Sequence, residues 1–170
     1  LDDKGVKLYK RGFRLLEEQL ATYIKEYYSG VSKIEFSPIF VQGGDGQTMF
    51  DANIVPVIYD NHGNKAYLGR KVGKHGYASY SLLGDLRLDF NGFDEEVIEI
   101  DVDGKFLDIT NYKSLPPKAK LTINPSMDEN IEALVNAGHL KDVVKSEKGS
   151  LKANIEYNLE IRRGSYSEWK

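Results

Sequence analysis

The first thirty residues carry apolar side chains at intervals of three and four, with charged residues between them. This spacing places the apolar residues on one face of an α-helix and the charged residues on the other, solvated face. We expect the helix to cover residues 7–28 and to end before Gly30, a residue suited to a left-handed C-terminal cap. Gly12 interrupts it at about 1 kcal/mol relative to alanine. The apolar face comprises Tyr9, Phe13, Leu16, Leu20, Ile24 and Tyr27, and the charged face Lys10, Arg14, Glu17, Glu18 and Lys25.

The next part of the chain is typical of β-strands. Strands are predicted over residues 32–42, 48–59 and 65–72, with a glycine-rich turn at residues 43–46. Pro38 indicates an edge or a bulge, and Pro56 argues against a central, fully paired position, because proline has no amide hydrogen to donate.

Two further strands and a second helix are expected after residue 90. Residues 97–102 and 105–110 flank Asp103-Gly104, the strongest hairpin signal in the chain. A capping box from Ser126 to Glu129 predicts the start of a short helix, and Gly138 its end. Residues 151–161 alternate apolar and polar without a break, which predicts one long strand with a dry face and a wet face.

These elements predict an α+β fold in a single domain over residues 1–170. The long N-terminal helix would pack across a curved antiparallel sheet, and the short second helix would precede the last strand. Pro116-Pro117 marks a stiff connection and a candidate subdomain boundary near residues 111–120.

Composition excludes several functional classes. The chain has 170 residues and a net charge of −3, which argues against a general nucleic-acid binder, since backbone contacts need a clear excess of lysine and arginine. It contains no cysteine, which rules out thiol catalysis, zinc–thiolate sites and disulfides. No apolar run is long enough to span a membrane. We predict no cofactor.

The histidines give no metal site, because His62, His75 and His139 lack the mutual spacing of ligands. Residues 69–75 resemble a phosphate loop only superficially, since the glycine spacing is short and histidine replaces the hydroxyl. Two interpretations of this stretch remain open: a face for an anionic or carbohydrate ligand, or a solvated loop whose tyrosines pack on the sheet. The candidate ligand-binding residues are Lys71, Lys74, His75, Tyr77 and Tyr80.

Nine carboxylates between Asp85 and Asp108 face only Arg87 and Lys105. Asp101-Val102-Asp103-Gly104 does not match a calcium loop of the EF-hand type, in which glycine is sixth and glutamate twelfth. A strand, a turn and a strand explain these residues. A weak calcium site or a face for a basic partner remains as the alternative.

Residues 23–36, YIKEYYSGVSKIEF, carry the one resemblance to known proteins. They resemble the junction between helix and first strand in small exported lipoproteins and surface proteins of Gram-positive bacteria, some of them cystatin-like. The similarity extends over residues 8–67. It implies an exported or cell-surface location and a helix cradled by an antiparallel sheet. The lipidation cysteine of such proteins is missing, and the resemblance assigns no catalytic residues.

Three functional hypotheses follow. The leading one is a non-enzymatic exported module that binds an unknown protein or an anionic or carbohydrate ligand of the cell envelope. The start at Leu1 without an initiator methionine favours a processed or a trimmed chain. The alternative is a small α+β hydrolase or transferase, which would be cytoplasmic and would need a pocket where His62 or His75 meets two carboxylates. The third is a structural part of a larger surface assembly.

Overall fold

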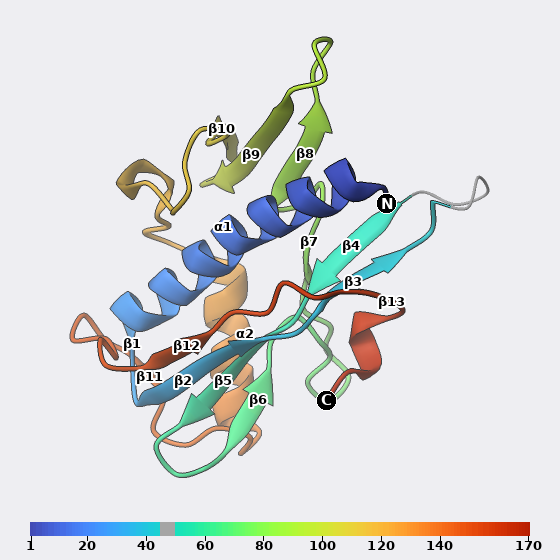
Figure 1. Cartoon of the computed structure of the whole chain (residues 1–170). Coiled ribbons are helices and arrows are strands. Elements are labelled where there is room, and N and C mark those ends of the chain that lie inside the picture. Colours follow the sequence, from blue (N-terminus) through green and yellow to red (C-terminus); the bar gives the residue numbers. More distant parts are fainter. Residues whose placement is uncertain (45–49) are drawn as a thin grey trace.

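The computed structural model describes residues 1–44 and 50–170 and opens with the long helix α1, Asp3–Tyr27 (Figure 1). The helix begins one turn earlier than the apolar spacing predicted, because the Asp2 carboxylate caps it by accepting the Gly5 amide at 2.8 Å. It ends at Tyr27, and the C-cap residue Tyr28 has an extended backbone and donates its amide to the Ile24 carbonyl. The predicted N-terminal helix is thus confirmed, with an additional turn.

Gly30 does not cap this helix as the sequence suggested. It follows β1 (Tyr28–Ser29), which pairs with β11 (Val144–Lys145), and its φ is +86°. A Cβ at Gly30 would lie 1.9 Å from the Asp142 carbonyl oxygen. Glycine is therefore required here both for the positive φ and for the close approach of the segment before β11.

Two four-stranded sheets make up most of the β structure. Each strand of the second sheet comes directly before or after a strand of the first sheet along the chain. The first sheet contains, in spatial order, β12 (Asn154–Glu156), β2 (Val31–Phe36), β5 (Pro56–Asp60) and β6 (Lys65–Tyr67). The second contains β13 (Ile161–Arg163), β3 (Ile39–Gln42), β4 (Asp51–Ile54) and β7 (Tyr80–Ser81). All neighbours are antiparallel except β12 with β2 and β13 with β3, which are parallel.

The strand predicted over residues 32–42 is divided at Ser37 and Pro38 into β2 and β3, so Pro38 marks a break between two central strands and not the edge or bulge that the sequence suggested. Ser37 bridges the break: its amide donates to the Val55 carbonyl at 3.0 Å, and its hydroxyl accepts the Val55 amide at 2.8 Å. Pro56 does not exclude a central position, as the sequence suggested, because it is the first residue of β5, which lies between β2 and β6. The predicted third strand is shorter than expected and ends at Tyr67. Residues 45–49, within the predicted turn and second strand, lie outside the described part.

A separate three-stranded antiparallel sheet packs on the other side of α1 (Figure 1). The Asp103-Gly104 turn has φ of +53° and +89°, so the predicted hairpin is confirmed with two left-handed residues. Gly12 lies where α1 meets this sheet, and a Cβ there would stand 2.3 Å from Leu88 Cδ2. Gly12 lowers the intrinsic stability of the helix, but it allows α1 to pack closely against Leu88. The sheet order is β10 (Lys105–Asp108), β9 (Glu96–Val102) and β8 (Leu86–Phe90).

The second helix, α2, covers Pro125–Asn136. Its N-cap is Asn124, whose side chain accepts the Met127 amide, and not Ser126 as the capping-box pattern predicted. The predicted end is confirmed: Gly138 has φ of +81° and donates its amide to the Val135 carbonyl. A short 3-10 helix, η1 (Pro117–Ala119), precedes α2. A second one, η2 (Tyr166–Glu168), lies near the C-terminal end of the described chain.

A shared carboxylate ties the end of α1 to the start of α2. The hydroxyls of Tyr23 and Tyr28 both donate to Asp128 Oδ1, at 2.8 and 2.6 Å, and Lys145 Nζ donates to Asp128 Oδ2 at 2.6 Å. Burial, followed by Asp128, raises the pKa of Tyr23 and of Tyr28. These tyrosines are therefore neutral donors that join two helices.

The long C-terminal strand predicted over residues 151–161 is wrong. The chain forms only the short strands β12 and β13, and Leu151 is 69% exposed. Between the strands the Asn158 amide turns to the Glu17 carboxylate, donating to Oε1 at 3.0 Å. Glu17 itself was assigned to the solvated face of α1 but is fully buried. Both errors have one cause, because this contact joins residues 141 positions apart.

One hydrophobic cluster draws on the N-terminal helix, all three larger sheets and α2. It includes Leu16 of α1, Ile34 of β2, Ile100 of β9 and Ile131 of α2. The α+β class, with a long first helix, a short second helix and mostly antiparallel strands, is confirmed. None of the described helices has the length and apolar character of a membrane span.

Gly30→Ala is expected to destabilise the chain by more than Gly63→Ala. The two glycines have nearly equal φ, +86° and +87°, but only a Cβ at position 30 meets another atom, since position 63 is open to 4 Å. Gly63→Ala should lower the free energy of unfolding by about 1 kcal/mol through the left-handed backbone alone. Gly30→Ala should lower it by at least about 2 kcal/mol, measured by urea denaturation, because the Asp142 segment must also move. Equal losses would contradict a packing role for Gly30.

Glu17→Gln is expected to stabilise the chain increasingly as pH rises. Burial raises the pKa of Glu17 to about 9, and the Asn158 amide and Arg14 oppose the shift only in part. Because the folded pKa exceeds the unfolded value of 4.5, the wild type loses stability between these two pH values. The gain from Glu17→Gln at pH 7 should be on the order of 3 kcal/mol.

Urea denaturation at pH 5 and pH 8 measures this difference. The exposed substitution Glu132→Gln is the control and should follow the wild type at both pH values. A constant difference between Glu17→Gln and the wild type would show that Glu17 does not become neutral on folding.

Candidate functional site

The largest described cavity is a groove of about 780 Å³ beside the N-terminal half of α1. Its opposite walls come from the start of β9, the segment after β10 and the link between β12 and β13. Five lining side chains are cationic and two are carboxylates, an excess of three positive charges in a chain whose net charge is −3. The lining residues are Lys7, Lys10, Arg11, Arg14, Glu95, Glu96, Thr110, Asn111, Tyr112, Lys113 and Leu159.

Arg11 fixes two walls of this groove to each other. Its guanidinium donates to Glu96 Oε1 at 2.5 Å and to the Thr110 carbonyl at 2.6 Å. Thr110 is in turn held by its hydroxyl, which accepts the Ile98 amide at 2.9 Å. Arg11 therefore connects α1 to both β9 and the segment after β10, and much of its donor capacity is used inside the protein.

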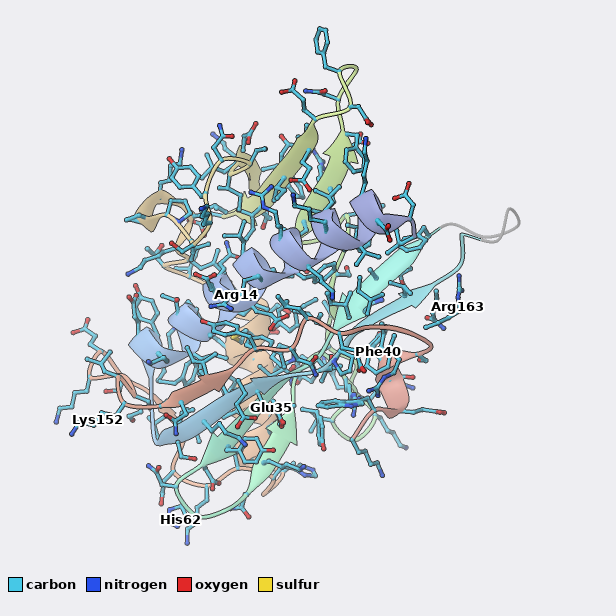
Figure 2. All side chains as sticks on the ribbon, viewed as in Figure 1. Arg14, Glu35, Phe40, His62, Lys152 and Arg163 are labelled. Carbon is cyan, nitrogen blue, oxygen red and sulfur yellow. The ribbon has the colours of Figure 1, made fainter. Side chains whose placement is uncertain are left out.

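Arg14 is held at the other end of the groove. Its Nε donates to Glu18 Oε2 at 3.1 Å, and its guanidinium stacks 3.6 Å from the centre of the Tyr157 ring. Figure 2 shows Arg14 on the side of α1 that faces the C-terminal segment. Glu18 also accepts the Leu115 amide at 3.1 Å, which fixes the carboxylate that positions Arg14. Stacking on an aromatic ring leaves the edge of a guanidinium free to bind anions.

The three lysines of the groove differ from its two arginines in their contacts. Lys7, Lys10 and Lys113 are exposed and form no ion pair with any residue in the described ranges. Tyr112 and Leu159 add an apolar wall near them. The groove thus combines pre-positioned arginines, uncommitted ammonium groups and an apolar surface, which is an arrangement suited to holding phosphate or carboxylate groups.

The sequence-predicted site is only partly brought together. Val72 and His75 exchange backbone hydrogen bonds around a tight turn, and the rings of His75 and Tyr77 lie 4.7 Å apart. Lys71 and Lys74 are exposed in the same loop. Tyr80 belongs elsewhere: it pairs with Ile54 in β4 and is only 6% exposed. The loop residues line none of the four described cavities, and ligand binding there stays a prediction.

The structure places the two turn histidines, on which the hydrolase or transferase hypothesis depends, at exposed positions. His62 Nε2 lies 2.8 Å from Asp142 Oδ2 at the exposed end of the β5–β6 turn (Figure 2). Asp60 is close in the chain but is engaged by four hydrogen bonds from the residues at 62, 64 and 141. Burial alone would raise the pKa of Asp60, but these hydrogen bonds lower it to about 2. Neither His62 nor His75 lines a described cavity.

The acidic stretch from Asp85 to Asp108 forms the strands β8, β9 and β10, as the strand-turn-strand interpretation predicted. Within the described ranges, no three His, Asp or Glu side chains converge in a way that could hold a metal ion. Three of the carboxylates, those of Asp85, Asp101 and Asp103, instead line a second cavity of about 370 Å³.

Sequence reasoning placed Lys10 and Arg14 on a solvated face, gave Lys7 and Arg11 no role, and so missed the groove. A local signal existed, because Lys7, Arg11 and Arg14 follow each other at intervals of four and three residues, one side of a helix. What turns this side into a groove is the approach of Glu96 and Thr110, which are 85 and 99 residues away from Arg11.

Comparison of the chain with protein-family models, with curated proteins and with solved structures found no match.

Arg11→Ala and Lys10→Ala should separate structural from uncommitted cations in the groove. Arg11→Ala removes two hydrogen bonds and leaves Glu96 without its ion-pair partner, so we expect a loss of about 1–3 kcal/mol in unfolding free energy. Lys10→Ala should change it by less than about 0.5 kcal/mol, since Lys10 pairs with no described residue. Urea denaturation of both variants decides the point, and equal losses would contradict the assignment.

Proposed function

We propose that this chain is a non-enzymatic binding module whose cationic groove holds an anionic polymer, one that carries repeated phosphate or carboxylate groups. The observation that carries the proposal is the excess of three positive charges around a cavity of about 780 Å³ in a chain that is negative overall. An uneven distribution of this kind concentrates anions at one face and repels them from the rest.

The state of the cations supports binding over a purely structural role. Arg11 and Arg14 are held in place by Glu96 and Glu18, so little side-chain entropy is lost when an anion approaches them. Lys7, Lys10 and Lys113 are exposed on two different walls, and their ammonium groups can move to meet successive anionic groups.

The shape of the groove favours a polymer over a small ion. The volume is in the range of sites that hold a drug-sized ligand, well above that needed for one phosphate. Tyr112, 40% exposed, and Leu159 offer apolar contacts for the uncharged part of a chain between its anionic groups. The same chemistry would serve a polyphosphate-type or a polycarboxylate-type ligand.

An exported or cell-surface location accompanies this proposal, because residues 23–36 resemble the corresponding segment of exported proteins. An anionic polymer of the cell envelope would then be the natural ligand. Recovery of the native protein from the cytosol alone would contradict that location without affecting the groove.

Calorimetric titration with inorganic polyphosphate and with polyglutamate tests the groove. The triple variant Lys7→Glu, Lys10→Glu, Lys113→Glu should bind at least tenfold more weakly than the wild type, because three attractions become repulsions. Affinity should also fall as salt is raised from about 50 to 150 mM, since exposed charges are screened. Comparing the two polymers shows whether phosphate or carboxylate groups are preferred.

The matched control is Lys71→Glu, Lys74→Glu, Lys152→Glu, which makes the same change in net charge at exposed positions away from the groove. It should stay within about threefold of the wild type, the size expected from long-range electrostatics alone. A larger loss in the control than in the groove variant would move the site to the loop around His75. Absence of binding to both polymers would remove the proposal.

A further inference from the structure

A second cavity has a volume of about 370 Å³. Unlike the groove, it is lined by carboxylates and by no cationic side chain. It is bounded by Gln19 and Leu20 of α1, by the start of β7, by the open end of the β8–β9 pair and by the N-terminal end of α2. It shares no lining residue with the cationic groove.

Two aspartates that line this cavity oppose each other at the end of the β8–β9 ladder. Leu86 pairs with Ile100 in the β8–β9 ladder, which places Asp85 directly opposite Asp101, and the Asp101 amide donates to the Asp85 carbonyl at 2.9 Å. Directly opposed residues of an antiparallel pair project to the same side, so two like charges here destabilise the sheet. No described lysine, arginine or histidine forms an ion pair with Asp85, Asp101 or the neighbouring Asp103.

The Tyr80 side chain adds a second kind of polar group to the lining of the cavity. Tyr80 lines the cavity and is only 6% exposed, and no hydrogen bond of its hydroxyl is found among the described residues. Because the hydroxyl is not among the fully buried atoms that lack a partner, it is accessible from the cavity and can bind a ligand there. The cavity is therefore lined by one hydroxyl, which can donate or accept a hydrogen bond, and by two opposed aspartates. None of its lining side chains is cationic.

The raised pKa of Asp85 indicates that its negative charge is poorly stabilised in the described chain. Burial raises the pKa of Asp85 to about 6, the Ser81 amide opposes the shift, and Asp101 adds to it. At neutral pH most molecules therefore still carry the negative charge of Asp85. The Ser81 amide, 2.8 Å from Asp85 Oδ2, is the one hydrogen bond that this carboxylate accepts in the described chain.

We propose that this cavity binds the ammonium group of an organic cation between Asp85 and Asp101, with the Tyr80 hydroxyl as the third acceptor. The mouth of the cavity explains why an organic cation fits better than a metal ion. Leu121 and the exposed Ile123 line it, and they would contact the alkyl stem of an amine. The arrangement of carboxylates beside an apolar wall resembles the way proteins hold a lysine side chain, with the head paired and the stem buried.

The test uses the full chain and n-butylammonium as the probe, followed by amide chemical shifts in NMR. We expect saturable shifts confined to residues 78–81, 85, 101–104 and 121–126, with a dissociation constant of about 1 mM or tighter, the affinity that one buried ion pair and a short stem can supply. The uncharged isostere 1-butanol should give no saturable shifts there. Equal binding of 1-butanol, or shifts elsewhere in the protein, would overturn the proposal.

Variants separate the cavity from general electrostatic attraction. Asp85→Asn with Asp101→Asn should weaken n-butylammonium binding at least tenfold, and Tyr80→Phe about threefold or more. The control Asp89→Asn with Glu99→Gln removes two negative charges from the same sheet outside the cavity and should bind like the wild type. Equal losses in the two double variants would reduce the effect to net charge and contradict the site.

Two further outcomes would also contradict it. Calcium chloride that gives saturable shifts at the same residues, and displaces the amine, would make this a metal site. An Asp85→Asn, Asp101→Asn variant that melts below the wild type, with no amine added, would show that the two carboxylates stabilise the fold by themselves. We expect its melting temperature to be equal or higher, because a like-charge pair has been removed.

Discussion

The burial of α1 on two sides is the constraint on which the rest of the structure depends. The helix lies between the β8–β9–β10 sheet and the two four-stranded sheets, and roughly half of its residues are buried. A helix covered on both sides keeps only a narrow exposed stripe, and its charged residues must share that stripe. Lys7, Lys10 and Arg14 therefore stand beside one another, and the neighbouring sheet completes the wall of a groove. The cationic site is a consequence of how the core is packed.

Glu17 connects this core to the groove at some cost in stability. Its carboxyl group is neutral at physiological pH because burial raises its pKa to about 9, and one of its oxygens has no partner among the described atoms. The other oxygen accepts the Asn158 amide, which holds the link between β12 and β13 against α1. That link carries Tyr157, on which Arg14 stacks, and Leu159, which lines the groove. A destabilising residue in the core thereby positions one wall of the site.

Local patterns predicted those elements that local interactions determine. The three- and four-residue spacing identified α1, and Asp103-Gly104 identified the tightest hairpin, since both depend on neighbouring residues. The prediction of a strand over residues 151–161 was wrong because the alternation of apolar and polar residues does not indicate the contact between Asn158 and the distant Glu17. The cap of α2 was misplaced by two residues, although Asn124 followed by Pro125 is itself a start signal. Both cavities escaped prediction for the same reason: in each, the wall from α1 meets segments that lie 58 or more residues later in the chain (from residue 20 to residue 78 in the second cavity).

A structure of the chain with bound tripolyphosphate tests the central claim most directly. The groove interpretation predicts an ordered anion beside α1, with its oxygens within hydrogen-bonding distance of Lys10, of Arg14 and of Lys113 on the facing wall. An anion held instead by Lys71 and Lys74 in the loop around His75, or a groove that stays empty at saturating tripolyphosphate, would contradict it.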